Sequence, residues 1–298
     1  MRQLLAEFIF LVYHTGMKQY RKRPQKRHYS EKGASGQENG MPRKKKYLGQ
    51  HFLRKQSVVD HMIEAVNVTS VHSVLEIGCG DGFLTRSILA QTACKQLRVY
   101  EIDQEWFEYV GGQIHDPRLK LILSNILDVD FDLELAGDQP WIVLANLPYQ
   151  ITFPIMFRLV KYRHLFTEGV VMIQEEVAQK IVAQRGKGFS ATSLFLQHNF
   201  EFKLMEKIEP GAFSPPPKVF SRLLYFKPRV DQPDIPNPEK FWKFLKLCFA
   251  HPRQMLRNNL RSTHYAWQTL PEYILSLRAQ QMSFQVFLDL WSRLGHEK

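Results

Sequence analysis

Four consecutive residues, Asn146-Leu147-Pro148-Tyr149, combine groups that can prepare an exocyclic amino group for methylation. The amino nitrogen of adenine is a poor nucleophile because its lone pair is delocalised into the ring. Two acceptors aimed at its N–H groups, the Asn146 side-chain oxygen and the Leu147 carbonyl, would localise that lone pair. Pro148 has no N–H to compete, and Tyr149 offers a ring for a base extruded from its helix. The segment therefore predicts methyl transfer to adenine; an ordinary strand that ends in a proline turn is the alternative.

A second aromatic residue, Phe213, lies in a proline-rich loop. Pro215, Pro216 and Pro217 follow it and restrict the backbone of the loop. A rigid loop can present Phe213 to the other face of the extruded base. A buried Phe in an ordinary proline-rich connection is the alternative.

A glycine-rich turn upstream indicates a nucleoside-containing methyl donor. Glu76 precedes Gly78-x-Gly80-x-Gly82, between an apolar strand and a segment of helical periodicity. Glycines let the backbone pass close to a ligand. A dinucleotide would require GxGxxG with a helix N-terminus facing its pyrophosphate, whereas a carboxylate beside the loop suits a cation. S-adenosylmethionine fits these residues, and a turn that binds nothing is the alternative.

Two further polar residues follow apolar segments. Glu101 ends the next expected strand, where a carboxylate can accept both ribose hydroxyls of a nucleoside. Asn125 follows the strand expected at 119–123, where an amide can bond the adenine amino group of the cofactor. Taken alone, Asn125 is better explained as an ordinary loop residue, and only the neighbouring motifs favour a ligand role.

The elements that must position these residues alternate between strand and helix, which predicts a doubly wound α/β sheet. Ligands of such sheets bind at the carboxyl ends of the strands. Strands are expected at 74–77, 97–101, 119–123 and 141–145, with a helix at 83–91.

Length, cysteines and charge set outer bounds. The 298 residues suffice for one full domain and a smaller one. Cys79, Cys94 and Cys248 form no CxxC pair, which indicates a reducing, cytoplasmic setting, and the histidines lack metal-ligand spacing, so no metal site is expected. Of the net charge of +11, residues 1–46 carry 12 Lys and Arg against 3 Asp and Glu. Any RNA-binding face on the remaining chain must therefore be a local patch.

Residues 1–46 are expected to form a disordered basic tail. The apolar run from Leu4 to Tyr13 is shorter than the roughly 20 residues that span a bilayer, and basic residues follow it, unlike a secretory signal. A mis-assigned start upstream of Met41 and a transit peptide are the alternatives. Removal of 1–40 is expected to leave activity intact.

The C-terminal part is expected to be helical and to bind RNA. Arg253, Arg257 and Arg261 recur at i, i+4 and i+8 and would share one helical face, where they can bind phosphates of folded RNA. A solvated charged face is the alternative. Helices are expected after a proline-punctuated linker at 229–241, around 240–261, 271–279 and 283–294.

Together these motifs resemble those of the KsgA-type ribosomal RNA adenine dimethyltransferases. Ordered segments at compatible spacing are more specific than any one alone. The matching segments are YLGQHFL at 47–53, EIGCGDGFLT at 76–85, YEID at 100–103, NLPY at 146–149, FSPPPKV at 213–219 and PRQMLRNNL at 252–260.

The resemblance implies a class I methyltransferase fold, with a Rossmann-like domain in residues 47–228 and a linker and small helical RNA-binding domain in 229–298. It implies dimethylation, from S-adenosylmethionine, of two adjacent adenosines near the 3′ end of small-subunit rRNA during ribosome biogenesis. The partner would be the 30S pre-ribosomal particle, and the enzyme a cytoplasmic monomer.

The resemblance also implies roles for single residues. Gly78 lies against the methionine part of the cofactor, Glu101 holds the ribose and Asn125 meets the adenine. Asn146 to Tyr149 and Phe213 take the target base. The other residues expected at the cofactor are His51, Leu53, Glu76, Gly80 and Asn146.

Two departures from the family pattern put details in doubt. Asn125 stands where the family commonly has Asp, so cofactor affinity is expected to be weaker. KGFSATS at 187–193 replaces a segment that usually contains Tyr-Gly, which leaves substrate positioning there open.

Competing functions remain at this point. An erythromycin-resistance-type methyltransferase of large-subunit rRNA shares the chemistry, and a non-catalytic RNA-binding assembly factor shares the fold. A DNA adenine methyltransferase typically has an acidic first residue where this chain has Asn146. A nicotinamide dehydrogenase is disfavoured by GxGxG.

Overall fold

The structure is a computed structural model that describes residues 41–294 except 44, 46–48 and 139. The expected disorder of residues 1–40 concerns a segment outside the described residues. The described chain divides into two compact units, one with residues up to Ala178 and Glu201–Pro228, the other with Gln179–Phe200 and the residues from Arg229 onward. No helix among the described residues has the length and apolarity that a membrane span requires.

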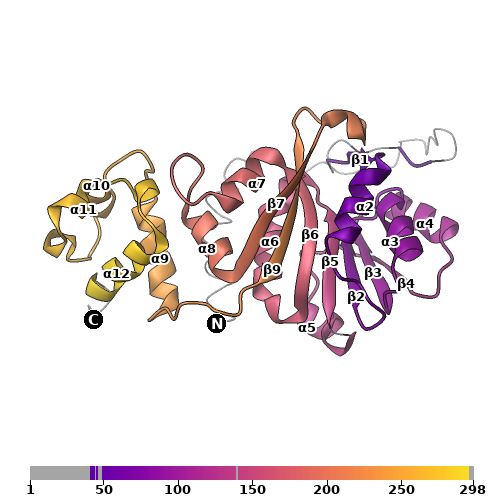
Figure 1. Ribbon diagram of the computed structural model, residues 1–298, viewed down its shortest axis with the longest axis horizontal. Coiled ribbons are helices and arrows are strands. Elements are labelled where there is room, and N and C mark those ends of the chain that lie inside the picture. Colours follow the sequence, from indigo (N-terminus) through magenta and orange to yellow (C-terminus); the bar gives the residue numbers. More distant parts are fainter. Residues whose placement is uncertain (1–40, 44, 46–48, 139, 295–298) are drawn as a thin grey trace, which may run out of the picture. The chain divides into compact units, whose positions relative to one another are not determined.

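A seven-stranded sheet forms the centre of the larger unit (Figure 1). The five strands from β4 to β6 run parallel to their neighbours, and β9 runs antiparallel to β6. Their spatial order is β4 (Leu119–Leu123), β3 (Gln96–Glu101), β2 (Ser73–Ile77), β5 (Trp141–Asn146), β6 (Phe166–Gln174), β9 (Ser221–Pro228) and β7 (Phe200–Ile208). The expected α/β sheet is thus confirmed, and the expected strands match β2, β3, β4 and β5 within one residue at each end.

The central strands form where mostly apolar segments can be buried on both faces. Every residue of β2 and β3 is buried, as are the first five of β5, which is the pattern of parallel strands covered on both faces. β2 pairs with β3 on one side and with β5 on the other. The direction of winding therefore reverses between β2 and β5, and the carboxyl ends there form the crevice in which such sheets bind ligands.

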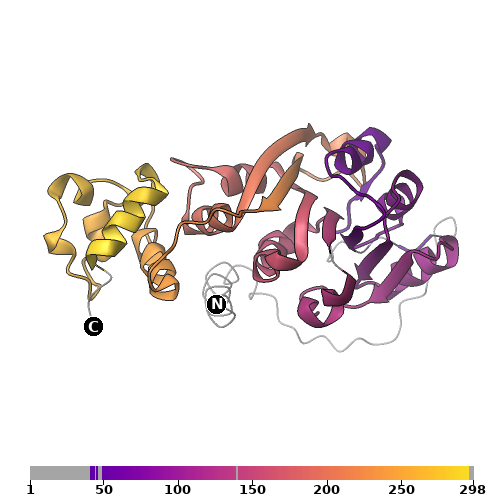
Figure 2. The same cartoon turned by 60° about the horizontal axis from the view of Figure 1, so that its bottom comes forward.

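Helices connect the parallel strands and lie against the sheet (Figures 1 and 2). The larger unit contains α2 (Gln56–Glu64), α3 (Phe83–Gln91), α4 (Gln104–Gln113), α5 (Phe131–Glu134), α6 (Thr152–Lys161) and the start of α7 (Glu175–Val182). Short 3₁₀ turns occur at Ala136–Asp138, Tyr149–Ile151, Arg163–Leu165 and Pro210–Ala212.

A separate two-stranded sheet joins two segments that are far apart in the sequence. β1 (Phe52–Leu53) pairs antiparallel with β8 (Phe213–Ser214), so that Leu53 lies opposite Phe213. Arg54 N also donates to Ala212 O at 2.8 Å. The segment Gly49–Leu53, called here the leading segment, is therefore fastened to the proline-rich loop.

The second unit is helical and built around aromatic side chains. Phe241 and Phe244 are buried, and each contacts the buried Trp291, with ring centroids 6.0 and 5.6 Å apart. The unit contains α8 (Ala191–Asn199), α9 (Pro238–Cys248), α10 (Leu256–Leu260), α11 (Glu272–Leu275) and α12 (Phe284–Leu294), and 3₁₀ turns at Trp267–Thr269 and Ala279–Gln281.

This unit takes in a stretch that the sequence assigned to the catalytic domain. The expected boundary stood at residue 229, whereas Gln179–Phe200 clusters with the C-terminal helices. Packing explains the grouping: the Phe195 ring meets Trp242 at 5.1 Å between centroids, and Phe189 meets Phe249 at 5.6 Å. Local sequence patterns do not reveal such long-range contacts.

Two expected helical segments differ from those observed. The segment 271–279 contains only the four-residue α11, and the helical pattern around 240–261 is interrupted between Cys248 and Leu256. Pro252 lies in the gap; proline offers no N–H to a helix and disfavours helical backbone in the residue before it. α9 begins at Pro238, inside the expected linker, with proline in its first turn. The helix expected at 283–294 is confirmed as α12.

Candidate active site

A cavity of about 320 Å³ lies at the carboxyl ends of β2, β3, β4 and β5 in the larger unit. Its walls come from the leading segment and from the turns that follow these strands. It brings together every residue predicted for the cofactor, and the first four residues predicted for the base: His51, Leu53, Glu76, Gly78, Gly80, Glu101, Asn125 and Asn146, with Leu147, Pro148 and Tyr149.

The glycine turn uses its glycines for two different purposes. Gly78 has φ +77° and no atom within 4 Å of where a Cβ would stand, so its backbone faces open space that a ligand can occupy. At Gly80, φ +53°, a Cβ would lie 2.6 Å from the Phe52 ring. Gly78 therefore suits the predicted ligand contact, whereas the missing side chain of Gly80 leaves room for the Phe52 ring of the leading segment.

Glu76 is fully buried at the end of β2. Its Oε2 accepts a hydrogen bond from Thr85 Oγ1 at 2.8 Å, and its Oε1 has no hydrogen-bond partner among the described residues. Burial raises the pKa of this carboxyl to about 8, against the opposing effect of the Thr85 bond and with further help from the charges of Glu101 and Asp81. An orphaned acceptor beside open space at Gly78 fits the ammonium group of S-adenosylmethionine.

Glu101, predicted to hold the ribose, is fixed by backbone N–H groups. Its Oε1 accepts from Ile102 N and Asp103 N, both at 2.9 Å. Its Oε2 accepts from Gly80 N at 3.2 Å and from the Cys79 thiol at 3.5 Å. Because Oε1 is held by two short bonds, Oε2 is the oxygen at which a ribose hydroxyl would compete with weaker partners.

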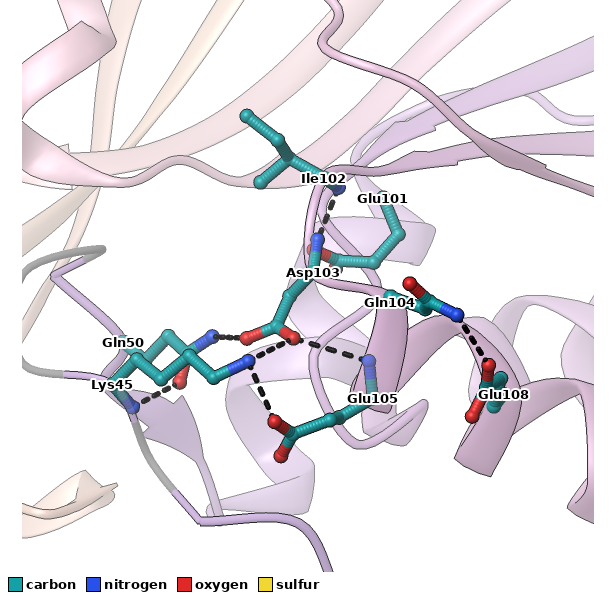
Figure 3. Close-up of polar contacts among 8 residues, drawn as sticks. All are labelled: Lys45, Gln50, Glu101, Ile102, Asp103, Gln104, Glu105 and Glu108. Carbon is teal, nitrogen blue, oxygen red and sulfur yellow. Dashed lines mark hydrogen bonds and ion pairs between the residues drawn. The ribbon is translucent and has the colours of Figure 1, made fainter. Parts of the chain in front are cut away.

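Sequence reasoning missed a polar cluster that ties down the start of the leading segment (Figure 3). Lys45 Nζ contacts Asp103 Oδ1 at 2.7 Å and Glu105 Oε1 at 3.0 Å, and Gln50 Nε2 donates to Asp103 Oδ2 at 3.0 Å. Asp103 also caps α4 by accepting from Glu105 N at 3.2 Å. Asp103 belongs to the YEID motif, so its position just after β3 could be predicted from the sequence. Its partners Lys45 and Gln50 could not, because they are distant in the chain.

The position of Lys45 corrects the expected boundary of the N-terminal tail. The tail was set at residues 1–46, yet Lys45 is bonded to the folded unit. Burial lowers the pKa of its ammonium group, but the hydrogen bonds to Asp103 and Glu105 outweigh that effect and hold the pKa above its usual value. The sequence does not distinguish one lysine of this basic run from the next. Only the fold shows that Lys45 forms an ion pair with the buried carboxylate of Asp103.

Asn125, predicted to meet the cofactor adenine, lies on the cavity wall and is already bonded locally. Its Oδ1 accepts from Leu127 N at 3.1 Å, and its Nδ2 donates to Asp128 Oδ2 at 2.8 Å. These bonds fix the side chain in a turn. An amide oxygen has two lone pairs, so Oδ1 retains one acceptor site.

Asn146 and Tyr149 are positioned by the leading segment and by β9. Asn146 Nδ2 donates to His51 O at 3.1 Å, while the Tyr149 hydroxyl shares a 2.6 Å hydrogen bond with the buried Ser221 hydroxyl. The His51 and Tyr149 rings stack with centroids 5.8 Å apart. Burial raises the pKa of Tyr149, opposed by the Ser221 bond. Both side chains are thus held by residues distant in sequence.

Phe213, predicted to stack on the base, is not part of the cavity wall described above. It is 4% exposed and belongs to the hydrophobic core with Leu53, its partner across β1 and β8. The alternative reading, a buried Phe in a proline-rich connection, describes its position. The strand pairing explains the difference, because it turns this residue toward the core.

The arginines predicted to bind RNA do not form a helical stripe. Arg253 lies in the turn before α10, Arg257 lies within it and Arg261 follows its last residue. Arg257 is paired with Glu272. Because Arg253 precedes a five-residue helix, the i, i+4, i+8 argument for one shared face is wrong.

Comparisons with known proteins agree on one family. Residues 41–274 match the family described as "Ribosomal RNA adenine dimethylase". The protein named ribosomal RNA small subunit methyltransferase A of Lactobacillus delbrueckii subsp. bulgaricus is 36% identical over 231 residues, 73% of this chain and 77% of that protein. Its namesake in Syntrophotalea carbinolica is 34% identical over 256 residues, 82% of this chain and 94% of that protein.

Solved structures share the fold. A dimethyladenosine transferase from Plasmodium falciparum superimposes with a TM-score of 0.68 at 22% identity, over 82% of this chain and 97% of that one. The 23S rRNA methyltransferase ErmE gives 0.62 at 21% identity, over 82% and 100%. At these identities the likeness bears on the fold alone.

Proposed function

The chain belongs to the ribosomal RNA adenine dimethylase family, and we propose that its cavity at the carboxyl ends of β2 and β5 binds both the methyl donor and an adenosine of small-subunit rRNA. Family membership makes it an S-adenosylmethionine-dependent enzyme that dimethylates the N6 amino group of rRNA adenosines. The curated relatives above are named for the small subunit, which supports that choice of substrate.

One observation carries the assignment of the cavity: the way Asn146 is held. Its Nδ2 is engaged by His51 O, so the opposite atom of the same amide, Oδ1, is the acceptor available for the target amino group. An acceptor fixed in advance costs no reorganisation when the reaction occurs. Asn146 Oδ1 would accept a hydrogen bond from one N–H of the adenine amino group. This bond helps to localise the lone pair on the amino nitrogen.

Leu147 and Tyr149 complete the base-binding side. Leu147 N donates to Met172 O at 3.1 Å, so the backbone that carries the second proposed acceptor, Leu147 O, is anchored to β6. Pro148 follows and competes with no N–H. The Tyr149 ring, held by Ser221, offers a face for the extruded adenine.

On the other side of the cavity, Gly78, Glu76 and Glu101 would hold S-adenosylmethionine. When bound, this cofactor supplies an electrophilic methyl group on a sulfonium. Glu76 Oε1 would accept from its ammonium group, Glu101 Oε2 from its ribose, and the open side of Gly78 would leave room for its methionine part. These residues bind and orient the cofactor; none of them transfers a proton in the reaction.

The remaining expectations are proposed with the same support. The substrate is taken to be the 30S pre-ribosomal particle, methylated at adjacent adenosines, by a monomer in the cytoplasm. Phe213 is left out of the base-binding set because it is buried, and the three C-terminal arginines are left out of the RNA-binding set because Arg253 lies outside the short helix that contains Arg257.

The test is transfer of tritiated methyl groups from S-adenosylmethionine to undermethylated 30S subunits, with 50S subunits and duplex DNA as parallel acceptors. Nucleoside analysis of the product should give dimethyladenosine with 30S subunits alone. Labelling of 50S subunits would transfer the assignment to large-subunit rRNA. Cofactor binding without transfer to any acceptor would contradict the proposed function.

A further inference from the structure

The loop Pro215–Phe220, called here the proline loop, is tied at both ends to the base-binding side of the cavity. At its start, the ring N–H at Nδ1 of His51 donates to Pro215 O at 2.9 Å. Just after its end, Ser221 bonds the Tyr149 hydroxyl at 2.6 Å. His51 and Tyr149 line the cavity and stack on each other. The proline loop therefore lies beside the cavity wall that receives the base.

The far end of this loop carries two exposed apolar side chains. Val219 is 43% exposed and Phe220 is 44% exposed, and they are consecutive. Single exposed apolar residues are common, whereas contiguous exposed apolar surface can mark an interaction site. This adjacent pair lies in the loop beside the cavity wall.

The backbone of Phe220 is held rigidly. Its carbonyl accepts from Glu175 N at 2.9 Å. The Glu175 carboxylate in turn grips the guanidinium of Arg222, two residues further on, with contacts of 2.5 and 2.8 Å. A preformed position reduces the entropy that a contact loses on binding. Arg222 also neutralises the Glu175 carboxylate.

A lysine contacts the Phe220 ring, and a second lysine is exposed in the same loop. Lys207 Nζ lies 4.2 Å from the centroid of the Phe220 ring, a cation–π contact. Lys207 is itself exposed on β7, and Lys218 is exposed within the proline loop. An aromatic ring accompanied by lysines is the arrangement with which proteins bind single-stranded nucleic acid: a base stacks on the ring and the lysines meet its phosphate.

We propose that Phe220, with Lys207, forms a stacking platform for the nucleotide next to the target adenosine in the rRNA strand. The inference rests on the proposed function, since it takes the Asn146–Tyr149 side of the cavity as the place of the target base. It adds a substrate contact outside the cavity, made by residues that neither bind the cofactor nor touch the reacting amino group. Its role is to hold the strand in register while the base is extruded.

The experiment compares Phe220→Ala, Phe220→Leu and Phe220→Trp in the full chain. Affinity for undermethylated 30S subunits is measured by filter binding, and kcat and KM by tritiated methyl transfer. Phe220→Ala should weaken binding and raise KM for the particle by roughly tenfold, with kcat and cofactor affinity unchanged. Phe220→Trp should stay close to the parent, whereas Phe220→Leu, which keeps apolar bulk without a ring, should resemble Phe220→Ala.

One control variant and two further measurements separate stacking from general effects. Leu133→Ala removes an 83% exposed apolar side chain of α5, near the amino end of β5, and should change nothing. Lys207→Ala should reduce the slope of log affinity against log salt by about 1, as expected for one phosphate contact. Ultraviolet cross-linking followed by mass spectrometry should join Phe220 to a nucleotide of the small-subunit rRNA.

The outcomes are distinguishable. Equal particle affinity for the parent and Phe220→Ala would overturn the platform, and so would full rescue by Phe220→Leu, because packing alone would then explain the effect. A cross-link from Phe220 to a ribosomal protein in place of RNA would also overturn it. Absence of methyl transfer by the parent would instead contradict the proposed function, since particle binding is measured independently.

Discussion

The two sides of the cavity are held in place in different ways. On the β2–β3 side, the Glu101 carboxylate is fixed largely by the N–H groups of the next two residues. On the β5 side, Asn146 is held by His51, 95 residues away, and Tyr149 by Ser221, 72 residues away. The Glu101 carboxylate is therefore fixed mainly by near neighbours, whereas Asn146 and Tyr149 are held only after distant segments have met.

This difference suggests separable functions. Changes on the base side should act on methyl transfer with little effect on cofactor affinity, and changes on the cofactor side should do the reverse. Each variant below tests that separation, because a mixed effect would mean that the two sides act as one unit.

The largest effect is expected from Asn146→Ala on the base side. Loss of the fixed acceptor should lower kcat by at least about 100-fold, the magnitude found when one preorganised hydrogen-bonding group is removed from a reaction centre. Calorimetric titration with S-adenosylmethionine should give an affinity close to that of the parent. Asn125→Ala, an amide on the cofactor side, is the matched control and should weaken cofactor affinity with kcat retained. Near-full turnover by Asn146→Ala would refute its role.

Glu101→Gln should weaken cofactor binding. The amide has one acceptor oxygen in place of the carboxylate that receives two short backbone bonds, and it carries no charge. Cofactor affinity should fall roughly tenfold to 100-fold, as expected for hydrogen bonds to a charged group. At saturating cofactor, kcat should remain within a few-fold of the parent. A large fall in kcat with unchanged affinity would contradict the separation.

Glu76→Gln should reveal a pH-dependent contribution to stability. The folded protein keeps a proton on Glu76 up to a pKa of about 8, whereas the unfolded chain releases it near 4.5. The contribution of protonated Glu76 to the free energy of unfolding is therefore fully present below pH 4.5. It is lost as pH rises toward 8, by at most about 1.4 kcal/mol per pH unit. Denaturant unfolding at several pH values should give a flatter profile for the variant. Parallel profiles would show that Glu76 titrates normally.

The smallest effect is expected from Tyr149→Phe, which keeps the ring and removes the hydroxyl. Ser221 is fully buried and would lose its partner, so the free energy of unfolding should fall by about 1 kcal/mol. Methyl transfer should fall only a few-fold, because stacking is retained. Ser221→Ala and the double variant complete a cycle, and additive effects would show that the hydroxyls are not coupled.

Much of the cofactor side was predictable because its information is local. Glu76, Gly78 and Glu101 stand at or near the carboxyl ends of two largely apolar strands, and the carboxyl ends of parallel strands share one edge of a sheet. All three line the cavity as expected. The Asn146–Tyr149 segment was found for the same reason, since it begins at the last residue of β5.

The errors occurred where contacts span the chain. Phe213 looked free to stack because the sequence does not show that β8 pairs with β1 and buries it. The arginine stripe assumed a helix that includes Arg253, whereas α10 begins only at Leu256. Lys45 seemed to be one lysine of a basic tail until Asp103 was placed beside it.

By itself, the sequence determined the order of the strands along the chain, the glycine turn and the chemistry of the residues at the strand ends, since these depend on near neighbours. Only the tertiary structure decided which atoms of those residues stay available. It leaves Asn146 Oδ1 and Glu76 Oε1 without the bonds that occupy their twin atoms, and it exposes Phe220 while burying Phe213. The physical reason is that a hydrogen bond or a buried face has to be shared with a partner, and these partners lie far away in sequence.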